Sequence, residues 1–345
     1  MGVEIVEARP VQPGLEWDAF IAGQLPGSFY HCHGWKLLNE GHLGHSTTYL
    51  EARDGGALVG VLPLVLTRSR IFGRILCSMP FVNYGGPVAV DARTTRQLIQ
   101  AAQDHAGRVR ADYLELRCVE PVETDMHVSL HKISMTIDLD ADPDQLWNKF
   151  TSKHRTNIRR VYKDGLTVTA GGRELLPAFY AVMQRSWRDL GTPIYAQSYF
   201  QAIVDAFPDQ TRIFICYHSG EPVAVAFNGY FAGKVEGMWA GTTAAGHDLN
   251  ANYVLYWEMI KDACERGFRR YHLGRSTAGS GAEQFKKKWN AETSQLYWYY
   301  HRPLGGFKPV VNVNHPSFQL GIAAWRKLPL WATRVLGPRL ARVIP

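Results

Sequence analysis

The chain has 345 residues, of which 46% are hydrophobic and 20% are charged, and its formal net charge is +7. This length is typical of about two domains, and the hydrophobic fraction is that of a globular protein with a sizeable core. The positive excess is compatible with an anionic partner, such as a phosphorylated substrate, RNA or an acidic membrane surface. It is too small to favour a dedicated nucleic-acid-binding protein.

Redox and targeting signals point to the cytoplasm. The five cysteines are scattered, odd in number and without a CxxC pair, which indicates free thiols in a reducing compartment. The first residues, MGVEIVEARPVQPG, lack the charged and apolar regions of a signal peptide. The longest apolar run, residues 57–66, contains Pro63 and falls short of the roughly 20 residues of a membrane-spanning helix.

The first part of the chain mixes strand and helix patterns. Its predicted strands cover residues 3–8, 47–51, 58–66 and 112–117, and its predicted helices cover residues 15–25 and 94–109. The turn Arg53-Asp-Gly-Gly56 joins two of these strands, and Asp-Gly between alternating runs is a strong hairpin signal.

Two connecting stretches of this part contain candidate site residues. His31 and His33 are two residues apart, but neither His42 nor His45 completes a convincing ligand set, so we expect no metal site. Residues 79–87 contain Asn-Tyr-Gly-Gly, which predicts a constrained turn. The pattern leaves open whether Tyr84 only shapes this turn or also lines a pocket.

The second part repeats a similar order of elements. Its predicted strands cover residues 132–139, 166–170, 212–217, 222–230, 234–241, 270–273 and 296–301, and its predicted helices cover residues 145–163, 175–189, 198–207 and 252–266. A repeated supersecondary order indicates two domains of one α+β type. We place them at residues 1–130 and 131–305, followed by a basic tail at residues 306–345.

The stretch Tyr271–Asn290, YHLGRSTAGSGAEQFKKKWN, has the clearest functional pattern. Its Gly- and Ser-rich middle, residues 276–281, allows backbone N–H groups to approach an anion. The lysine triplet at residues 286–288 adds positive charge. The alternative interpretation is a surface loop followed by a solvated basic face.

The tail differs from the rest in composition. It interleaves arginines with Trp325, Trp331 and several leucines, and no acidic residue follows Glu292. Such a pattern is typical of a segment that lies on an anionic bilayer. Alternatively, the tail docks on the protein's own groove as two short helices divided by Pro329 and Pro338.

Taken together, several of these motifs resemble the FemAB family. Residues 153–160, KHRTNIRR, with KDGL at residues 163–166, are similar to its K-x-R-x-N-x-R…G-L helix. Residues 253–257, Gly267, Gly274 and the pair Phe285-Lys286 resemble its C-terminal signature. Residues 81–87 and 190–195 are similar to the subgroup found beside exopolysaccharide and exosortase (PEP-CTERM) loci. The resemblance covers nearly the whole chain.

The resemblance implies two tandem GNAT-like domains with mixed β-sheets flanked by helices. Family members transfer an aminoacyl group from charged tRNA to an amine of a peptidoglycan precursor. By resemblance, Phe285 and Lys286 lie at the reaction centre, and Lys286 stabilises the oxyanion. The predicted helix at residues 145–163, which contains the basic motif KHRTNIRR, would face a phosphate of RNA or of a nucleotide-sugar precursor. The residues assigned by this reasoning to substrate binding are Lys153, Arg155, Asn157, Arg159, Tyr84, Tyr253, Trp257, Arg275 and Ser276.

N-acyl transfer requires a neutral amine and donors for the tetrahedral oxyanion. The candidates for a general base are His272, Glu283 and Asp248. No Gly-x-Ser-x-Gly elbow is present, and no cysteine has an obvious histidine partner, which gives no sign of a nucleophile triad.

The acyl donor stays open, and we expect no bound cofactor. Residues 241–251 lack the usual spacing of a CoA pyrophosphate loop, which counts against acyl-CoA, whereas the absence of a long coiled-coil insertion counts against tRNA. The first hypothesis is therefore a cytoplasmic N-acyltransferase that acts on an amine of a cell-envelope or exopolysaccharide precursor, with aminoacyl-tRNA or acyl-CoA as co-substrate. The alternatives are a non-catalytic scaffold at the membrane face of a polysaccharide export system and, with less support, a nucleic-acid-binding module.

Overall fold

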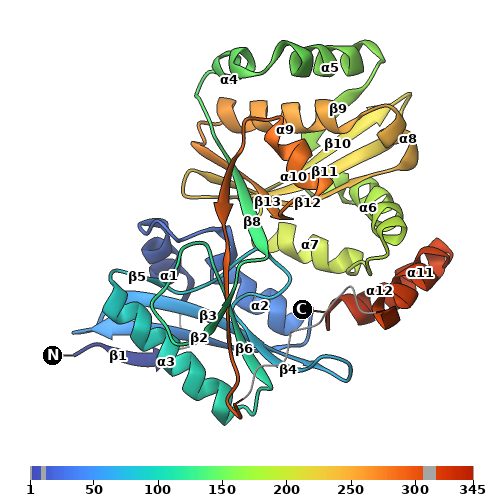
Figure 1. Cartoon of the computed structure of the whole chain (residues 1–345). Coiled ribbons are helices and arrows are strands. Elements are labelled where there is room, and N and C mark those ends of the chain that lie inside the picture. The colour runs from blue at the N-terminus through green and yellow to red at the C-terminus, as the bar shows by residue number, and fades with distance from the viewer. Residues whose placement is uncertain (1, 9–12, 306–315, 345) are drawn as a thin grey trace. The chain divides into compact units, whose positions relative to one another are not determined.

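The computed structural model describes residues 2–8, 13–305 and 316–344 (Figure 1). The chain divides into two compact units. The first comprises Met1–Ser134, Ser294–Val311 and Arg342–Pro345, and the second comprises Met135–Thr293 and Asn312–Ala341. Each unit contains a mixed sheet flanked by helices, which confirms the predicted α+β class. Among the described residues, no helix is long and apolar enough to cross a bilayer.

The first unit is built on an eight-stranded sheet with the order β1-β2-β3-β4-β6-β15-β7, and β5 pairs with β3. The strands are β1 (Glu4–Glu7), β2 (Ser46–Asp54), β3 (Ala57–Ser69), β4 (Gly73–Cys77), β5 (Val88–Ala89), β6 (Tyr113–Cys118), β7 (His127–Ser129) and β15 (Tyr297–His301). The helices are α1 (Pro13–Ala22), α2 (Gly34–Gly41) and α3 (Ala92–Arg108). As predicted, β2 and β3 form an antiparallel hairpin.

The position of β15 departs from the predicted domain limits. This strand lies within the predicted second domain, but it pairs with β6 and β7 of the first unit. Its central residues, Trp298, Tyr299 and Tyr300, are buried there. Both units are therefore discontinuous in sequence, because the chain returns to the first unit at β15 before it adds α11 and α12 to the second.

The second unit has a seven-stranded sheet with the order β14-β8-β13-β12-β11-β10-β9. These strands are β8 (Lys132–Asp138), β9 (Thr167–Gly171), β10 (Thr211–His218), β11 (Glu221–Phe231), β12 (Lys234–Thr242), β13 (Arg270–Thr277) and β14 (Glu292–Gln295). The strands β9 to β12 are antiparallel neighbours, whereas β12 and β13 are parallel.

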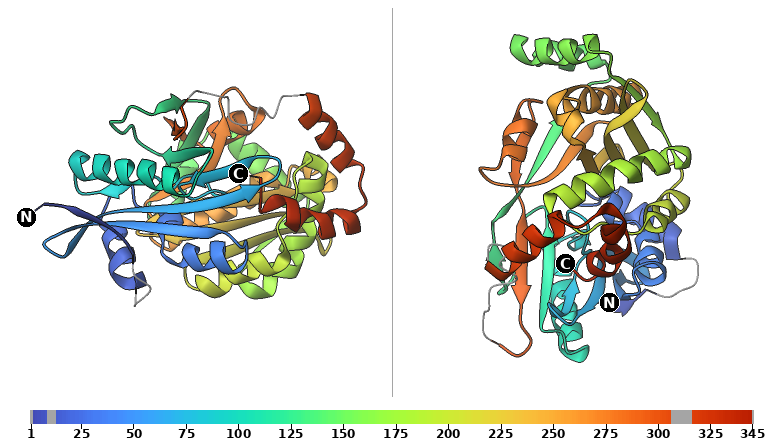
Figure 2. Two further views of the ribbon diagram at one scale, coloured as in Figure 1. Left: turned by 90° about the horizontal axis from the view of Figure 1, so that it is seen from below. Right: turned by 90° about the vertical axis from the view of Figure 1, so that its right-hand side faces the viewer.

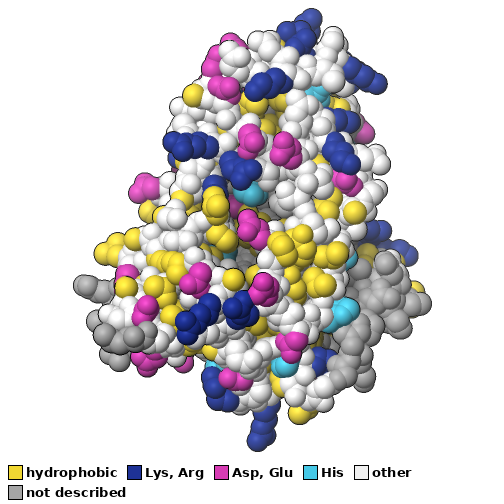
Figure 3. Space-filling view, turned by 60° about the vertical axis from the view of Figure 1, so that its left-hand side comes forward, with side chains coloured by type: hydrophobic (Ala, Val, Ile, Leu, Met, Phe, Trp, Pro, Cys, Tyr) yellow, Lys and Arg dark blue, Asp and Glu magenta, His cyan; other side chains and the backbone are white. Residues whose placement is uncertain are grey.

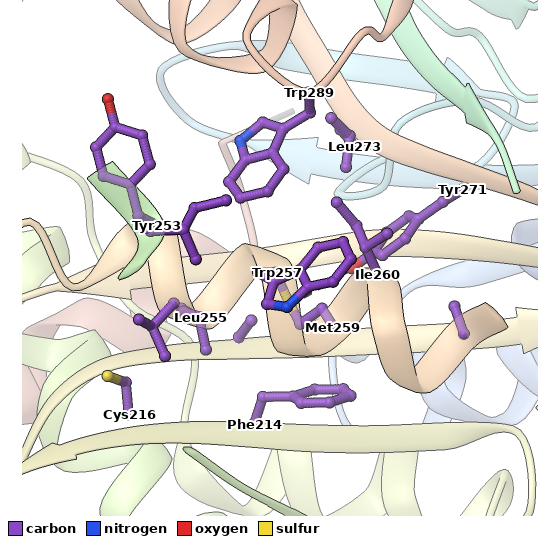
Figure 4. Close-up of a cluster of buried hydrophobic side chains, with 14 of the residues drawn as sticks. Phe214, Cys216, Tyr253, Leu255, Trp257, Met259, Ile260, Tyr271, Leu273 and Trp289 are labelled. Carbon is purple, nitrogen blue, oxygen red and sulfur yellow. Dashed lines mark hydrogen bonds between the residues drawn. The ribbon is translucent and has the colours of Figure 1, made fainter. Parts of the chain in front are cut away.

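Helices cover both faces of this sheet (Figures 1 and 2). They are α4 (Pro143–Lys149), α5 (Ser152–Lys163), α6 (Leu176–Leu190), α7 (Gln197–Ala206), α8 (Ala244–Asp248), α9 (Asn252–Glu265), α10 (Gly281–Lys287), α11 (Pro316–Arg326) and α12 (Leu330–Ala341). The residues of β10 are buried without alternation from Ile213 to Cys216, as expected for a strand with two covered faces. Phe214 and Cys216 belong to the core that α9 completes, shown in Figure 4.

Two predicted helices have different limits in the structure. The helix expected at residues 145–163 is two helices, because Phe150 leaves the helical conformation and the Thr151 side chain caps α5 by accepting the N–H of His154. In the tail, Pro329 does separate two helices, but Pro338 lies within α12. Residues 306–315, the first part of the predicted tail, lie outside the described residues.

Candidate active site

The strands β12 and β13 pair over only part of their length. Their parallel ladder joins Lys234–Glu236 to Arg270–His272 and then ends, although the strands continue to Thr242 and Thr277. Beyond this point, the backbone groups that the two strands turn toward each other no longer bond across the ladder. The end of β13 is held instead by a side chain from α10.

That side chain is Lys286. Its Nζ donates hydrogen bonds to the carbonyl oxygens of Gly274 and Arg275, at 3.0 and 3.2 Å, and to Oγ of Ser276 at 3.0 Å. These three bonds use all three ammonium protons. The structure therefore brings together three residues that the sequence assigned to the site, namely Lys286, Arg275 and Ser276.

Lys286 is a buried cation, with 7% of its surface exposed. Burial lowers the pKa of its ammonium group from 10.5 to about 8. Within the described part of the chain, no carboxylate pairs with it, and its partners are neutral oxygens. An unpaired buried charge is costly to a protein, and such residues are common at functional sites.

The loop that precedes α10 binds a carboxylate of the chain itself. Ser280 caps α10 by accepting the N–H of Glu283, and the Glu283 carboxylate accepts the N–H of Gly279 at 2.6 Å. This arrangement resembles a capping box, except that Glu283 accepts the N–H of the residue before the N-cap. Glu283 also pairs with Lys287 at 2.7 Å, and these bonds lower the pKa of its carboxyl group. The Glu283 carboxylate thus occupies one N–H of this loop, and its lowered pKa makes it a poor general base, while the binding of an external anion here stays a prediction.

Phe285 and Lys288, from the same stretch of sequence, contact α9 and Trp289 rather than β13. Phe285 contacts the rings of Tyr253, Tyr256 and Trp289, and Lys288 donates to the hydroxyl of Tyr253 at 3.1 Å. Figure 4 shows Tyr253 and Trp257 on α9 near Trp289. Phe285 therefore fastens α10 to α9, which places Lys286 against β13. The predicted catalytic role of Phe285 stays a prediction.

His272 occupies the last position of the β12–β13 ladder. Its Nδ1 lies 3.0 Å from the hydroxyl of Thr136 on β8. Burial, aided by Lys234 and Arg270, lowers the pKa of its imidazole to about 4, so the ring is neutral near pH 7. A neutral imidazole can accept a proton, which keeps His272 as a candidate base. Asp248, the other candidate, lies exposed at the end of α8.

Sequence reasoning overlooked the partner of His272 in the sheet. Glu236 is opposite His272 in the parallel register, so both side chains lie on one face of the sheet. Its side chain is fully buried. The signal was present, because Glu236 is the one acidic residue in the apolar strand pattern KVEGMWAG. Thr136, which bonds His272, gave no signal because it comes from a distant strand.

Two arginines of the basic helix α5 contact residues of the preceding helix α4. Nη1 of Arg155 donates to the carbonyl of Asn148 at 3.1 Å, and the guanidinium of Arg159 lies 5.3 Å from the ring centroid of Trp147. Lys153 is exposed and Asn157 half-buried. In the space-filling view, Lys and Arg side chains project from the region of these helices at the top of the molecule (Figure 3). Arg155 thus has a structural role in addition to any role in binding.

Two predicted binding residues lie elsewhere. Trp257 packs into the core of the second unit, with its ring centroid 4.9 Å from that of Trp147. Tyr84 lies in the first unit, where it lines a cleft of about 350 Å³ together with His31 and Arg117. His31 bonds Oγ of Ser28 and the carbonyl of Gly86 through its two ring nitrogens.

The connection from β12 to α9 does not have the form of an open pyrophosphate loop. Thr243 caps the short helix α8 by accepting the N–H of Gly246, and the N–H groups of His247, Leu249 and Ala251 donate to backbone carbonyls of the same stretch. A phosphate-binding loop instead presents N–H groups that have no partner in the chain. The bonding agrees with the absence of the CoA-type spacing from the sequence.

Part of this geometry is similar to a known protein family. Residues 149–287 match the acetyltransferase (GNAT) domain family. They contain the β12–β13 pair, α9 and Lys286. A search of curated proteins by sequence found no match.

Solved structures extend the likeness beyond the GNAT domain. The fold resembles that of FemX, with a TM-score of 0.66 at 15% identity over 92% of this chain and 99% of that one. It also resembles L-PGS from Bacillus licheniformis, with a TM-score of 0.55 at 13% identity over 93% and 96% of the two chains. A tandem GNAT protein of clavulanic acid biosynthesis gives a TM-score of 0.55 at 12% identity over 89% and 100%.

These likenesses confirm the predicted FemAB-like fold with tandem GNAT-like units. The match of residues 149–287 to the acetyltransferase (GNAT) family supports acyl transfer as the general chemistry. The donor, the acceptor and the narrower likeness to the exopolysaccharide-associated subgroup stay predictions.

Proposed function

We propose that the chain is an N-acyltransferase that moves an aminoacyl or acyl group onto an amine of a cell-envelope or exopolysaccharide precursor in the cytoplasm. The observation that carries the proposal is Lys286, a buried ammonium group at the point where β13 separates from β12 in the GNAT domain. A cation at this position suits a reaction whose intermediate carries a new negative charge on oxygen.

In the proposed reaction, the acceptor nitrogen attacks the carbonyl carbon of an ester or thioester donor. The new C–N bond forms, the carbonyl oxygen becomes an oxyanion, and the amine loses a proton. When the carbonyl is restored, the bond to the donor oxygen or sulfur breaks, and that atom takes up a proton. Lys286 stabilises the oxyanion by turning one N–H away from its β13 acceptors. His272 accepts the amine proton, because its ring is neutral near pH 7.

We favour an aminoacyl-tRNA over an acyl-CoA as the donor. The N–H groups of the β12–α9 connection are engaged within the chain, which leaves a pyrophosphate few partners there. The exposed cations of α5 offer contacts to phosphates of tRNA or of a nucleotide-linked acceptor.

A donor screen tests the proposal. The purified chain is incubated with tRNA charged with radiolabelled amino acids, with deacylated tRNA, or with acetyl- and long-chain acyl-CoAs, and its melting temperature is measured in parallel. A ligand that binds only the folded chain raises the melting temperature. We expect a shift with charged tRNA and movement of label to an added amine-bearing glycan or peptide precursor. A shift with acyl-CoA alone would identify acyl-CoA rather than aminoacyl-tRNA as the donor. The absence of both a shift and transfer would contradict the proposal that the chain is an acyltransferase.

The pKa of Lys286 predicts a characteristic pH dependence. Oxyanion stabilisation requires the ammonium form, so the transfer rate should fall as the pH rises through about 8. Stability should change in the opposite direction. The folded chain binds fewer protons at Lys286 than the unfolded chain between about pH 8 and 10.5, so this group's contribution to the free energy of unfolding increases across that window.

Parallel measurement of rate and melting temperature against pH checks this prediction. The comparison uses the difference between the wild-type chain and Lys286→Met, which removes the contribution of other groups. A rate that stays constant from pH 7 to well above 8 would show that the charge of Lys286 is not used.

The role of His272 predicts a second result. His272→Asn keeps an amide group near Thr136 but removes Nε2, so it should lower the rate by about 10²-fold, as expected for loss of a general base. The matched control is Thr136→Val, which removes the hydroxyl partner and leaves the ring in place. If His272→Asn keeps the wild-type rate and pH profile, the base is another group, and Glu236→Gln becomes the next variant to measure.

A further inference from the structure

The helices α11 and α12 pack on α6 (Figure 2), α11 with the large side chain of Trp325 buried and α12 with small side chains. The buried residues of α12 are Ala332, Thr333, Gly337 and Ala341. A Cβ atom on Gly337 would lie 2.8 Å from the carbonyl oxygen of Ile194, so only glycine allows this close approach. These contacts fix the orientation of α12 on the second unit.

Both helices, and the neighbouring end of α6, also expose large apolar side chains. Leu320 is 73% exposed, Trp331 is 72% exposed and Val335 is 57% exposed, and Leu336 and Leu190 also face solvent. A helix that docks on a water-soluble domain normally turns its large apolar residues inward and its small or polar residues outward. The arrangement on α12 is the reverse. A cluster of exposed apolar residues of this kind marks an interaction surface.

The charged residues of α11 and α12 have one sign, although the exposed Asp189 of α6 lies next to Leu190. Arg326, Lys327, Arg334 and Arg339 are exposed, and the sequence has no acidic residue after Glu292. Trp331, Val335 and Arg339 follow one another at intervals of four, so they form one stripe along α12. The face thus combines a tryptophan, aliphatic side chains and cations, which is the composition of helices that lie in the interface of an anionic bilayer.

We propose that this face of α11 and α12 docks on a membrane that contains anionic lipids. Trp331, Val335 and Leu320 insert at the level of the headgroups, while Arg334 and Arg339 contact lipid phosphates. The aliphatic residues favour a bilayer over RNA, because they offer nothing to a phosphate backbone or a base edge. The proposal is independent of which group the GNAT domain transfers, and it predicts a peripheral protein that can leave the surface when salt is raised.

Vesicle flotation with the full chain tests the proposal. The vesicles contain phosphatidylcholine alone or phosphatidylcholine mixed with phosphatidylglycerol. We expect binding to the mixed vesicles only. The variant Trp331→Ala/Val335→Ser should weaken binding at least about tenfold, and Arg334→Gln/Arg339→Gln should weaken it about 30-fold, since each cation near an anionic surface contributes about 1 kcal/mol.

The matched control is Leu15→Ala/Arg93→Gln, which changes an exposed leucine and an exposed arginine on other helices. This control and both tail variants should keep the wild-type melting temperature, because every changed side chain is exposed. The proposal is wrong if the wild-type chain ignores anionic vesicles, binds neutral ones equally well, or binds as tightly with the tail variants. If the tail variants lose affinity for tRNA and keep their affinity for vesicles, the face is an RNA surface instead.

Discussion

Replacement of Lys286 by methionine should lower the transfer rate by about 10²–10³-fold, because it removes one donor to the oxyanion. The fold should survive, since methionine fills a similar volume without a buried charge. Relief of that charge opposes the loss of three hydrogen bonds to β13, so we expect a melting temperature close to that of the wild-type chain. The measurement is the rate with charged tRNA under single-turnover conditions, together with thermal unfolding.

The matched control is Lys287→Met, one residue further along α10. Lys287 is exposed and pairs with Glu283, so its loss should leave the rate within about twofold of the wild-type value and lower stability by less than about 1 kcal/mol. Equal rates for Lys286→Met and the wild-type chain would show that Lys286 does not stabilise the oxyanion. A large fall in melting temperature for Lys286→Met would show instead that the lysine is chiefly a structural clamp on β13.

Replacement of Arg117 by methionine should destabilise the chain by about 3–5 kcal/mol, because it leaves the carboxylate of Glu115 buried without its partner. The two side chains are about 2% exposed, and Nε of Arg117 lies 2.6 Å from Oε1 of Glu115. The guanidinium also packs 4.4 Å from the ring centroid of Trp298 and donates to the carbonyl of Val82. Denaturant unfolding monitored on the full chain measures the loss.

Two variants isolate the cause of this loss. Arg117→Met/Glu115→Gln removes both charges and should recover part of the stability, because no uncompensated carboxylate remains buried. Arg96→Met, from the exposed pair with Glu123, should cost less than about 1 kcal/mol. If Arg117→Met unfolds at the same denaturant concentration as Arg96→Met, the buried pair is not what stabilises this part of the first unit.

Local sequence signals were sufficient to predict most elements. The helices α5 and α9 end where predicted, at Gly165 and Gly267, and both glycines have the positive φ that favours this residue at a helix end. The hairpin β10–β11 consists of the strands predicted at residues 212–217 and 222–230. Helix ends and hairpins depend on a few neighbouring residues, so the sequence of one short segment is enough to predict them.

The features that the sequence did not predict depend on packing between distant segments. Residues 281–287 gave the pattern of a flexible loop and a basic run, yet they form α10, because Phe285 packs on α9 and Lys286 bonds to β13. The three lysines therefore have three environments: Lys286 is buried, Lys287 pairs with Glu283, and Lys288 bonds Tyr253. Composition alone cannot distinguish them.

The candidate site was predicted in part. Lys286, Arg275 and Ser276 do lie together, but Tyr84 is in the other unit and Trp257 is in the core. The resemblance identified the residues that match the family's motifs. It did not distinguish residues that contact each other at the site from residues that pack in the core. Glu236 was missed because its significance depends on its register with His272, and a register between β12 and β13 is visible only in three dimensions.

The return of β15 to the first unit has a consequence for biosynthesis. A ribosome makes residues 1–134 first, but the sheet that they form lacks the strand between β6 and β7 until residues 297–301 have been translated. Until then, Arg117 also lacks the indole of Trp298 that covers it. Residues 135–293 of the second unit emerge while the first unit still lacks β15, so the nascent chain must keep an unpaired strand edge from aggregating throughout their translation.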